Sequence, residues 1–596
     1  MPFGAELRAD GVRFRLWAPG ARCVELGIAD ARGTVAWRDM PARDAGWYEL
    51  HVADAAAGTR YRYRLDRGDV VPDPAARFNP GDVHGDSQVV DPRAFDWTDA
   101  AWRNRPWHEA VIYELHVGTF TPQGTFRAVI ERLDYLARLG VTAIELMPLA
   151  DFPGARNWGY DGVLPYAPDA RYGTPEDLKA LVVAAHARGL MVLIDVVYNH
   201  FGPEGNYLHR LAPSFFTERH HTPWGAAIDF EGPDSRVVRD FFIHNALYWI
   251  EEFHVDGLRF DAVHAIVDAS QPDVLTELAT RVRDGPGRAR RVHLVLENDR
   301  NEAHRLMRDE ARRPRLYTAQ WNDDCHHALH VLLTGESASY YGDYADDPLR
   351  RLGRCLAEGF AYQGERSAFR AGPRGEPSAG LPPDAFVNFL QNHDQVGNRA
   401  LGERLAALAP ERALRIAVAI VLLAPSPPLL FMGEEFGAAT PFQFFCDFGP
   451  ELAEAVRNGR REEFAGLIDD STSVPDPTAL DTFEHSTLDW SSVERNGHAR
   501  WHALYVDLLA RRRDVIAPLI VRIVPGRATH AVPASGALDV RWPLDDGHTL
   551  VLHARLPGSN TPIPAAPPGA NVVYELWDEP PTRNAVVWRI DPPPAS

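Results

Sequence analysis

Lysine is nearly absent from this chain: Lys179 is the only one, and arginine supplies all the other basic side chains except histidine. This shortage removes the P-loop lysine of Walker-type nucleotide hydrolases and leaves no second candidate for a Schiff-base lysine. The four cysteines lie far apart with no CxxC spacing, which indicates free thiols in a reducing compartment rather than disulfides or metal ligands. We expect an activity that needs no cofactor.

Long hydrophobic runs and a surplus of positive charge are also missing. No apolar stretch approaches the roughly 20 residues that span a bilayer, and no basic start followed by an apolar run opens the sequence. The net charge of −20 leaves no excess of basic residues to neutralise phosphates, so neither a nucleic-acid nor a membrane partner is expected. A cytoplasmic protein with a neutral substrate is expected.

The 596 residues are too many for one compact core, and three regions differ in their patterns. Residues 1–95 carry short alternating strands punctuated by Gly, Pro and Asp, which is typical of a small immunoglobulin-like β-sandwich. Residues 96–520 alternate strand and helix signals, with eight strand candidates of which the sixth is 315–319. This pattern predicts a (β/α)8 TIM barrel with loop insertions. Residues 521–596 return to short strands and prolines, so the predicted fold class is a multidomain α/β protein whose barrel is flanked by two β-sandwiches.

Four short segments place acids, histidine or arginine where predicted strands end: DVVYNH (195–200), GLRFDAVH (257–264), LENDRN (296–301) and QNHDQVGN (391–398). A parallel α/β barrel builds its active site from the loops that follow the carboxyl ends of its strands. Asp261, Glu297 and Asp394 each follow such a strand, so we expect the three carboxylates to meet in one site. Taken alone each segment has a plainer interpretation, because an Asp after an Arg on a strand is more often a structural ion pair.

In their order and chain context, the four segments together resemble the α-amylase family of retaining glycoside hydrolases and transferases. The resemblance implies that Asp261 is the nucleophile of a glycosyl-enzyme intermediate and that Glu297 is the general acid and then the general base. It implies that Asp394 binds ring hydroxyls and favours a distorted sugar. Glu297 ends an apolar strand, and such surroundings help to raise the pKa of a carboxylic acid.

The same resemblance assigns substrate-binding roles to further residues. Arg259 stands two residues before Asp261, so on a strand both side chains point to one face, and the guanidinium keeps that carboxylate ionised. Tyr160 in NWGYDG matches the aromatic platform below the central sugar, although packing is its plainer role, and Asp195 matches the support of Arg259. The other expected contacts are His200, His264, His393, Gln395 and Asn398. Asn199 binds calcium in many amylases, but no companion ligands accompany it, so no metal is predicted.

Within the family, three features resemble its trehalohydrolase branch. The N-terminal region leads into the linker PDPAARFNPGDVHGDSQVVD (72–91), which resembles the linker of that branch. After Glu297 the chain continues as Asn298 and Asp299, whereas branching enzymes tend to have Ser or Glu directly after this acid. Segment 391–398 continues into RALGERL (399–405), as that branch does.

The most specific segment is AQWNDDCHHALHVLLTGE (319–336). The resemblance places four of its residues in the substrate site, where buried carboxylates accept paired sugar hydroxyls: Asp323, Asp324, His326 and His327. The plainer alternative is a helix N-terminus with Asn322 or Asp323 as its cap, acids on the helix dipole and histidines facing solvent. Cys325 stands where the family is expected to have Phe, and it alters sugar affinity only if that side chain contacts sugar rather than the core.

The implied activity is hydrolysis of the α-1,4-glucosidic bond next to the terminal trehalose unit of maltooligosyl trehalose. Free trehalose and a maltooligosaccharide are the implied products, and a functional link to the maltooligosyltrehalose synthase that makes the trehalose end is expected. The first alternative is a glycogen branching enzyme, in which a sugar 6-hydroxyl instead of water intercepts the same intermediate. The second is a non-catalytic glucan-binding protein, but such proteins usually lose one of the three acids, and all three are present here.

Overall fold

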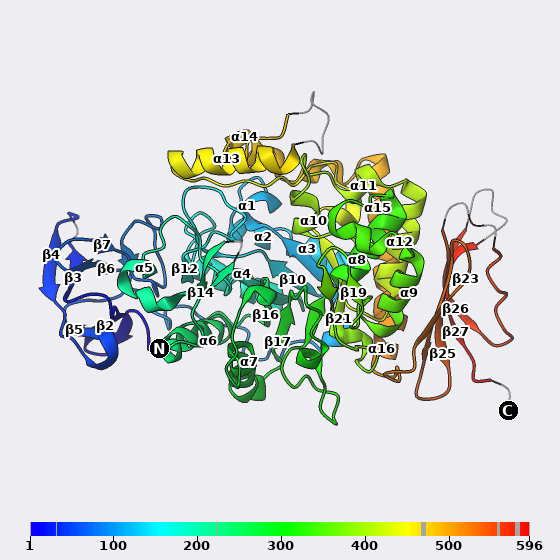
Figure 1. The fold of residues 1–596 in the computed structure, drawn as a ribbon, viewed down its shortest axis with the longest axis horizontal. Helices are drawn as coiled ribbons and strands as arrows, with labels where there is room; N and C mark the ends of the chain where they lie inside the picture. The colour runs from blue at the N-terminus through cyan, green and yellow to red at the C-terminus, as the bar shows by residue number, and fades with distance from the viewer. Residues whose placement is uncertain are drawn as a thin grey trace.

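A computed structural model of the chain describes residues 2–30, 32–222, 224–465, 473–556, 559, 561–577 and 584–594. A closed barrel of eight parallel strands lies at its centre, with the N-terminal sheets at one end of the long axis and the C-terminal sheet at the other (Figure 1). This arrangement confirms the predicted fold class, a multidomain α/β protein with a central (β/α)8 barrel and a β-rich region at each end. Within the part of the chain that the structure describes, the C-terminal region is one antiparallel sheet rather than the two sheets of a sandwich. Among the described residues, no helix is long and apolar enough to cross a membrane.

The N-terminal region is built from two antiparallel sheets. One contains β1 (Glu6–Arg8), β2 (Gly11–Trp17) and β5 (Trp47–Val52). The other contains β4 (Val35–Asp39), β3 (Val24–Ala29), β6 (Arg60–Leu65) and β7 (Val70–Val71), with β8 (Ser87–Gln88) also paired to β6. On β2 the side chains of Val12, Phe14 and Leu16 are buried while Arg13 and Arg15 between them are partly exposed, so the period-2 pattern directs one face of the strand into the core.

The barrel strands are short and buried at every residue. In chain order they are β9 (Ile112–Leu115), β10 (Ala143–Leu146), β13 (Met191–Val196), β16 (Gly257–Phe260), β17 (His293–Leu296), β18 (Ala319–Trp321), β21 (Phe386–Phe389) and β22 (Pro428–Phe431). Leu193, Val295, Trp321 and Phe389 belong to one apolar cluster contributed by these strands. Such clusters fill the interior of a TIM barrel, so the chemistry is confined to the strand ends.

The sixth strand lies later than the sequence predicts. It spans Ala319–Trp321 instead of 315–319, because the residues before it form hydrogen bonds within a loop instead of with the neighbouring strand. Pro314 bridges to Arg308, and the N–H of Arg315 donates to the carbonyl of Met307. Trp321 can therefore extend the strand and pair with β21. Asp323 and Asp324 follow the end of this strand, separated from it only by Asn322.

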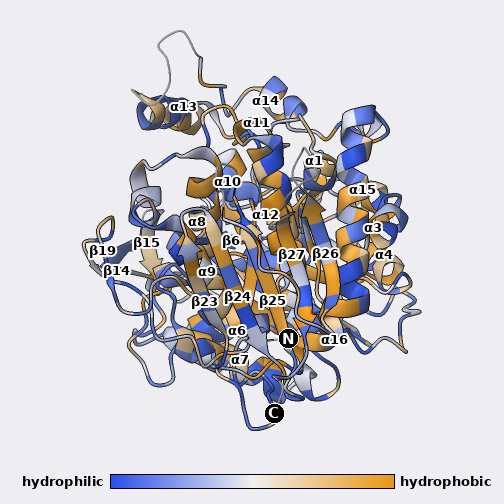
Figure 2. Cartoon of the chain, turned by 90° about the vertical axis from the view of Figure 1, so that its right-hand side faces the viewer, coloured by the Kyte–Doolittle hydropathy of each residue, from blue (hydrophilic) through white to orange (hydrophobic). Residues whose placement is uncertain are grey.

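The C-terminal region is a five-stranded antiparallel sheet in the order β23 (Thr529–Ala534), β24 (Ala537–Pro543), β25 (Thr549–Arg555), β27 (Asn584–Asp591) and β26 (Asn571–Trp577). Figure 2 shows this sheet from the front, with hydrophobic residues along its strands. Trp542 donates to the carbonyl of Leu356 in α9 (Pro348–Glu358), and Trp588 donates to that of Ala419 in α12 (Glu411–Leu423). The sheet therefore packs against helices of the barrel.

Candidate active site

The three predicted acids lie at the carboxyl ends of barrel strands. Asp261 directly follows β16, and Glu297 directly follows β17. Asp394 is the second residue of α10 (His393–Gly397), a short helix in the loop after β21. All three thus belong to the face on which TIM barrels carry their active sites.

Arg259 connects the two acids that follow β16 and β17. Its buried guanidinium donates to Asp261 at 3.0 Å and to Glu297 at 2.5 Å. It also donates to Asp195 at 2.6 Å, which is the support expected from the sequence. The guanidinium carbon lies 4.1 Å from the ring centroid of Trp321, so a cation–π contact holds it from below. One cation therefore holds Asp261 and Glu297 close together, with Asp195 as its third carboxylate partner.

The pKa values of these two acids reflect burial against this cation. Burial raises the pKa of Asp261 to about 6, and Arg259 opposes that rise. Burial also raises the pKa of Glu297, again opposed by Arg259. The backbone N–H of Ala262 donates to Oε2 of Glu297 at 2.9 Å, the same oxygen that Arg259 contacts. Both carboxylates thus have raised pKa values, and the same guanidinium limits the rise in each.

Asn199 is a contact of Asp261 that the sequence reasoning missed, because it weighed this residue only as a calcium ligand. Its side-chain N–H group donates to Oδ2 of Asp261 at 2.7 Å and to the Asp261 carbonyl at 2.8 Å. His200, the next residue, contacts the Asn199 side-chain oxygen and lies 3.0 Å from the carbonyl of Tyr160. The side-chain hydroxyl of Tyr160 donates to Asp195 at 2.7 Å. The segment DVVYNH could have indicated this role, because three of its six residues, Asp195, Asn199 and His200, contact residues of the site.

His393 and Asp394 are backed by a second missed residue, Glu114 of β9. Nδ1 of His393 lies 2.5 Å from Glu114, and Nε2 lies 3.3 Å from Asp394. Burial acts to lower the pKa of His393, but the two carboxylates outweigh it and raise that pKa well above the usual value. Burial acts to raise the pKa of Asp394, and His393 reverses this to a net lowering. Asp394 is therefore held ionised beside an imidazolium.

The remaining predicted residues after β16 and β21 lie around the acids. The Nδ1 atom of His264 accepts from the N–H of Asp299 at 3.4 Å. Asn398 donates to Asp394 at 3.2 Å. Gln395 accepts from the N–H of Asn392 and forms a capping box at the start of α10. The Gln395 side chain is thus used to build the loop that carries Asp394.

In segment 319–336, a helix does begin at the predicted place. It is α8 (Asp323–Thr334), and Asn322 makes no side-chain cap hydrogen bond. The expectation that its histidines face solvent is wrong, because His326 and His327 are both buried. His326 lies 2.6 Å from the carbonyl of Leu390 and 3.1 Å from the Tyr341 hydroxyl. Both ring nitrogens of His326 are therefore occupied within the protein.

The two acids of that helix lie in different surroundings. Asp324 is fully buried and pairs with Arg374, and it accepts from Tyr344, Asn301 and two backbone N–H groups. Asp323 is half-buried, and burial with the nearby charge of Glu297 raises its pKa well above the usual value. Cys325 lies in the hydrophobic core. Of these three side chains, Asp323 is the one with room to meet a substrate.

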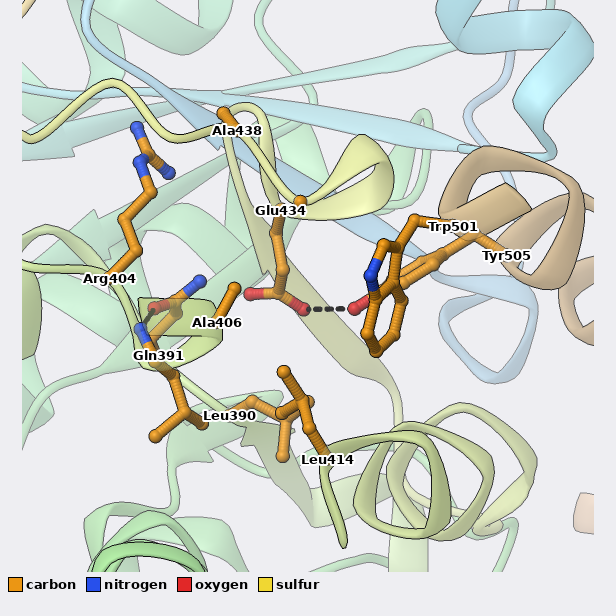
Figure 3. A pocket seen from close by; sticks show the side chains of 11 residues that line it. Leu390, Gln391, Arg404, Ala406, Leu414, Glu434, Ala438, Trp501 and Tyr505 are labelled. Carbon is orange, nitrogen blue, oxygen red and sulfur yellow. Dashed lines mark hydrogen bonds between the residues drawn. The ribbon is translucent and has the colours of Figure 1, made fainter. Parts of the chain in front are cut away.

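A small pocket whose lining contains none of the three acids lies around Glu434 (Figure 3). Gln391 and Leu390 line it from the end of β21, and Glu434 points into it with one oxygen 3.0 Å from the Tyr505 hydroxyl. Its volume of about 10 Å³ admits a single water molecule and no sugar. Within the described ranges, no group of three or more His, Cys, Asp or Glu residues is arranged to hold a metal ion.

Comparison with known proteins defines the family. A model of the alpha amylase catalytic domain matches residues 75–246, and a model of carbohydrate-binding module 48, the isoamylase N-terminal domain, matches residues 2–92. A malto-oligosyltrehalose trehalohydrolase from Deinococcus radiodurans is 46% identical over 85% of this chain and 81% of its own length. The chain belongs to the malto-oligosyltrehalose trehalohydrolase family. This confirms the resemblance drawn from the sequence.

Other matches agree with membership in the trehalohydrolase family. A solved structure of an α-amylase candidate from Salmonella typhimurium is 46% identical, covers 99% of both chains and superposes with a TM-score of 0.94. A 1,4-alpha-glucan branching enzyme from Streptomyces avermitilis is 37% identical over only 43% of this chain and 32% of its own length. The trehalohydrolases therefore match far more of the chain than this branching enzyme does.

Proposed function

We propose that this trehalohydrolase-family chain hydrolyses the α-1,4-glucosidic bond next to the terminal trehalose unit of maltooligosyl trehalose. Trehalose and a shortened maltooligosaccharide are the products. The observation that carries the catalytic assignment is the shared contact of Arg259 with Asp261 and Glu297, which holds two carboxylates of raised pKa side by side. The named activity of the Deinococcus radiodurans relative supports the choice of substrate.

In the first half of the reaction, ionised Asp261 attacks the anomeric carbon of the glucose joined to trehalose. The bond from that carbon to O4 of trehalose breaks, and protonated Glu297 gives its proton to the departing O4. Arg259 and Asn199 keep Asp261 in place and favour its ionised form. A glycosyl ester on Asp261 and free trehalose result.

In the second half, a water molecule attacks the same anomeric carbon. Glu297, now ionised, takes a proton from that water, and the ester bond to Asp261 breaks. Asp394 accepts hydrogen bonds from ring hydroxyls and stabilises the positive, oxocarbenium-like transition state, because His393 keeps it ionised. The two displacements together retain the anomeric configuration.

The substrate-contact roles are proposed with the same reasoning. Tyr160 stacks on His393 with 5.1 Å between ring centroids, which offers a rigid aromatic floor beside Asp394. His327 is proposed to bond a sugar hydroxyl, since its Nδ1 finds no partner among the described residues, and the half-buried Asp323 is proposed as a second contact. His200, whose ring nitrogens contact Asn199 and the carbonyl of Tyr160, is proposed to hold the Tyr160 platform in place beside the sugar. We also keep a cytoplasmic location and a functional link to the synthase that forms the trehalose end as parts of the proposal.

Domain boundaries at residues 95/96 and 520/521 belong to the proposal as well. Support at the first boundary comes from β8, which ends at Gln88, and from the module match that ends at residue 92. Support at the second comes from α16 (Ala517–Ile520), after which the C-terminal strands begin at Thr529.

Product analysis tests the proposed function. The purified protein is incubated with maltotetraosyl trehalose and, separately, with amylose. Release of trehalose and maltotetraose from the first, with little change in the second, is the expected result. New α-1,6 branches in amylose without trehalose release would contradict it and favour the branching reaction. Inactivity on both would favour a glucan-binding role.

A further inference from the structure

A short hairpin contacts the loop that carries the proposed general acid. It is formed by β19 (Arg366–Ser367) and β20 (Gly372–Pro373), which pair antiparallel between α9 and β21. The buried carboxylate of Asp343 holds its turn, because it accepts hydrogen bonds of 2.5 to 3.0 Å from one hydroxyl and two backbone N–H groups of residues 367–369. Arg370, the next residue, therefore extends from a backbone of fixed position.

Arg370 contacts Asp299, which stands two residues after Glu297. Its Nε donates to Oδ2 of Asp299 at 2.5 Å and its Nη2 donates to Oδ1, which is the forked geometry that matches a guanidinium to a carboxylate. Arg374, which follows β20, donates from Nε to the Asp299 carbonyl at 2.9 Å and from Nη2 to Oδ1 at 3.2 Å. The side chain and the backbone of Asp299 are thus both held by arginines of this segment.

The two residues before Asp299 are held at their backbone as well. The carbonyl of Glu297 accepts from the Val263 N–H at 3.0 Å, and the carbonyl of Asn298 accepts from the side chain of Gln320 at 2.9 Å. Three consecutive carbonyls of the acid loop therefore have partners, and these partners come from three different parts of the chain. The carboxyl group of Glu297 extends from this backbone.

The two arginines differ in their surroundings. The Arg374 side chain is 1% exposed and also pairs with the buried Asp324, so it serves the core. The side chains of Arg370 and Asp299 are 25% and 30% exposed, and ion pairs that water reaches contribute little to stability on average. A forked pair does supply a fixed geometry, and a reacting group depends on it, since a misplacement of about 1 Å can cost roughly 100-fold in rate.

We propose that Arg370 is a positioning residue for Glu297: through Asp299 it fixes the backbone from which the acid delivers its proton to the departing sugar oxygen. This inference deepens the proposed function and rests on it. General acid catalysis contributes about 10²- to 10⁴-fold, so imperfect alignment of Glu297 should cost part of that factor. The cost should fall on leaving groups that need a proton and spare those that do not.

Two substrates with different leaving groups test the proposal. Arg370→Gln is compared with the parent on maltotetraosyl trehalose and on α-maltotetraosyl fluoride, whose fluoride departs with the bonding electrons and takes no proton from Glu297. On the first substrate we expect kcat to fall about 10- to 100-fold, with KM within about threefold of the parent value. On the fluoride, kcat/KM reports only the steps up to loss of the leaving group and should stay within about threefold.

Further variants separate positioning from other effects. Asp299→Asn should show the same pattern, and the double variant should lose little more than either single variant, because the two residues act as a unit. Arg370→Lys keeps the charge but not the fork, so it should recover only part of the rate. The matched control is Arg38→Gln, since Arg38 forms a forked pair with Asp54 in the N-terminal region. It should behave like the parent, and thermal melting checks the folding of each variant.

Four results would overturn the proposal. Equal losses on the two substrates would indicate general damage to the site. A raised KM with unchanged kcat would make Arg370 a direct contact of the substrate. Fully additive losses in the double variant, or no loss in Arg370→Gln, would separate Arg370 from Glu297. Trehalose release by the parent tests the proposed function, whereas the ratio of variant to parent tests Arg370, so either can fail alone.

Discussion

The imidazole of His393 contacts the carboxylate of Glu114 across the top of the barrel, with 2.5 Å between Nδ1 and Oε1. Glu114 lies on the first barrel strand and His393 in the loop after the seventh, so the contact joins residues 279 positions apart. Its backbone counterpart, from the His393 N–H to Oε2, measures 3.1 Å. Glu114 thus fixes both the position and the charge of the residue that precedes Asp394.

Replacing Glu114 by Gln should therefore act through His393. The raised pKa of His393 depends on two carboxylates, so loss of one lowers it, and the imidazolium gives up its proton at a lower pH. We expect kcat to fall about 10- to 100-fold at pH 7, with the alkaline limb of the pH–rate profile shifted to lower pH. The control is Glu131→Gln, an exposed residue. An unshifted alkaline limb would show that Glu114 only packs.

The pair of acids joined by Arg259 gives the largest predicted losses. Asp261→Asn removes the nucleophile, and Glu297→Gln removes the proton donor without changing shape. We expect kcat on maltotetraosyl trehalose to fall by at least about 10³-fold in each variant, measured as trehalose release. Full activity of either variant would remove that residue from the mechanism.

The pH dependence should follow Asp261 on the acid side. Its pKa is raised to about 6 by burial, and it must be ionised to attack, so kcat/KM should decline below about pH 6. Asn199 donates to the ionised form, and Asn199→Ala should raise this pKa further and move the acid limb to higher pH. The loss relative to the parent should be greater at pH 5 than at pH 7.5. Asn206→Ala, which alters a loop residue elsewhere, should leave the limb in place.

Asp324 should govern stability rather than substrate affinity. It is fully buried and paired with the buried Arg374, and breaking such a pair costs about 3–5 kcal/mol. Asp324→Asn should therefore lower the midpoint of urea unfolding strongly. The neighbouring Asp323→Asn is the matched control and should change KM more than stability. If Asp324→Asn raised KM and left the unfolding midpoint unchanged, Asp324 would be a substrate-binding residue instead.

Glu434, in the pocket of Figure 3, should make the fold less stable as pH rises. Burial raises its pKa from 4.5 to about 8, so between these values the folded protein holds a proton that the unfolded chain has lost. Stability then falls with rising pH across that window, by up to about 1.4 kcal/mol per unit, and levels off above it. Glu434→Gln should remove this residue's share of the decline, while Glu435, with a pKa raised to about 7, keeps its own share. The advantage of the variant in thermal melting should therefore grow from pH 5 to pH 8.5. Exposed Glu454→Gln should show no such trend.

The sequence predicted the barrel and the meeting of its three acids because both follow from local patterns. Short buried strands followed by acids define strand ends, and a two-residue spacing is enough to place Arg259 and Asp261 on one face. The position of the sixth strand was missed because Pro314 and Arg315 pair with loop residues Arg308 and Met307. The alternation of apolar and polar residues in the sequence does not reveal such a contact.

Glu114 was missed for a different physical reason. It lies inside a strand whose residues are all buried, as in a hydrophobic core. Its functional role depends on a contact with His393, which is far away in the sequence. The different roles of Asp323 and Asp324, one beside the proposed substrate site and one in a buried ion pair, were not predicted either. Adjacent acids at a helix start look alike in sequence, and only the position of Arg374 separates them.

The single lysine has a practical consequence for handling the protein. Lys179 is wholly buried in α4 (Pro175–His186), with its ammonium group 3.6 Å from Glu252 and 5.2 Å from the ring centroid of Phe253. Reagents that couple to lysine side chains, such as activated esters used for fluorescent labelling or surface immobilisation, will find none accessible in the folded state. A lysine introduced on the surface would therefore be the one accessible lysine side chain.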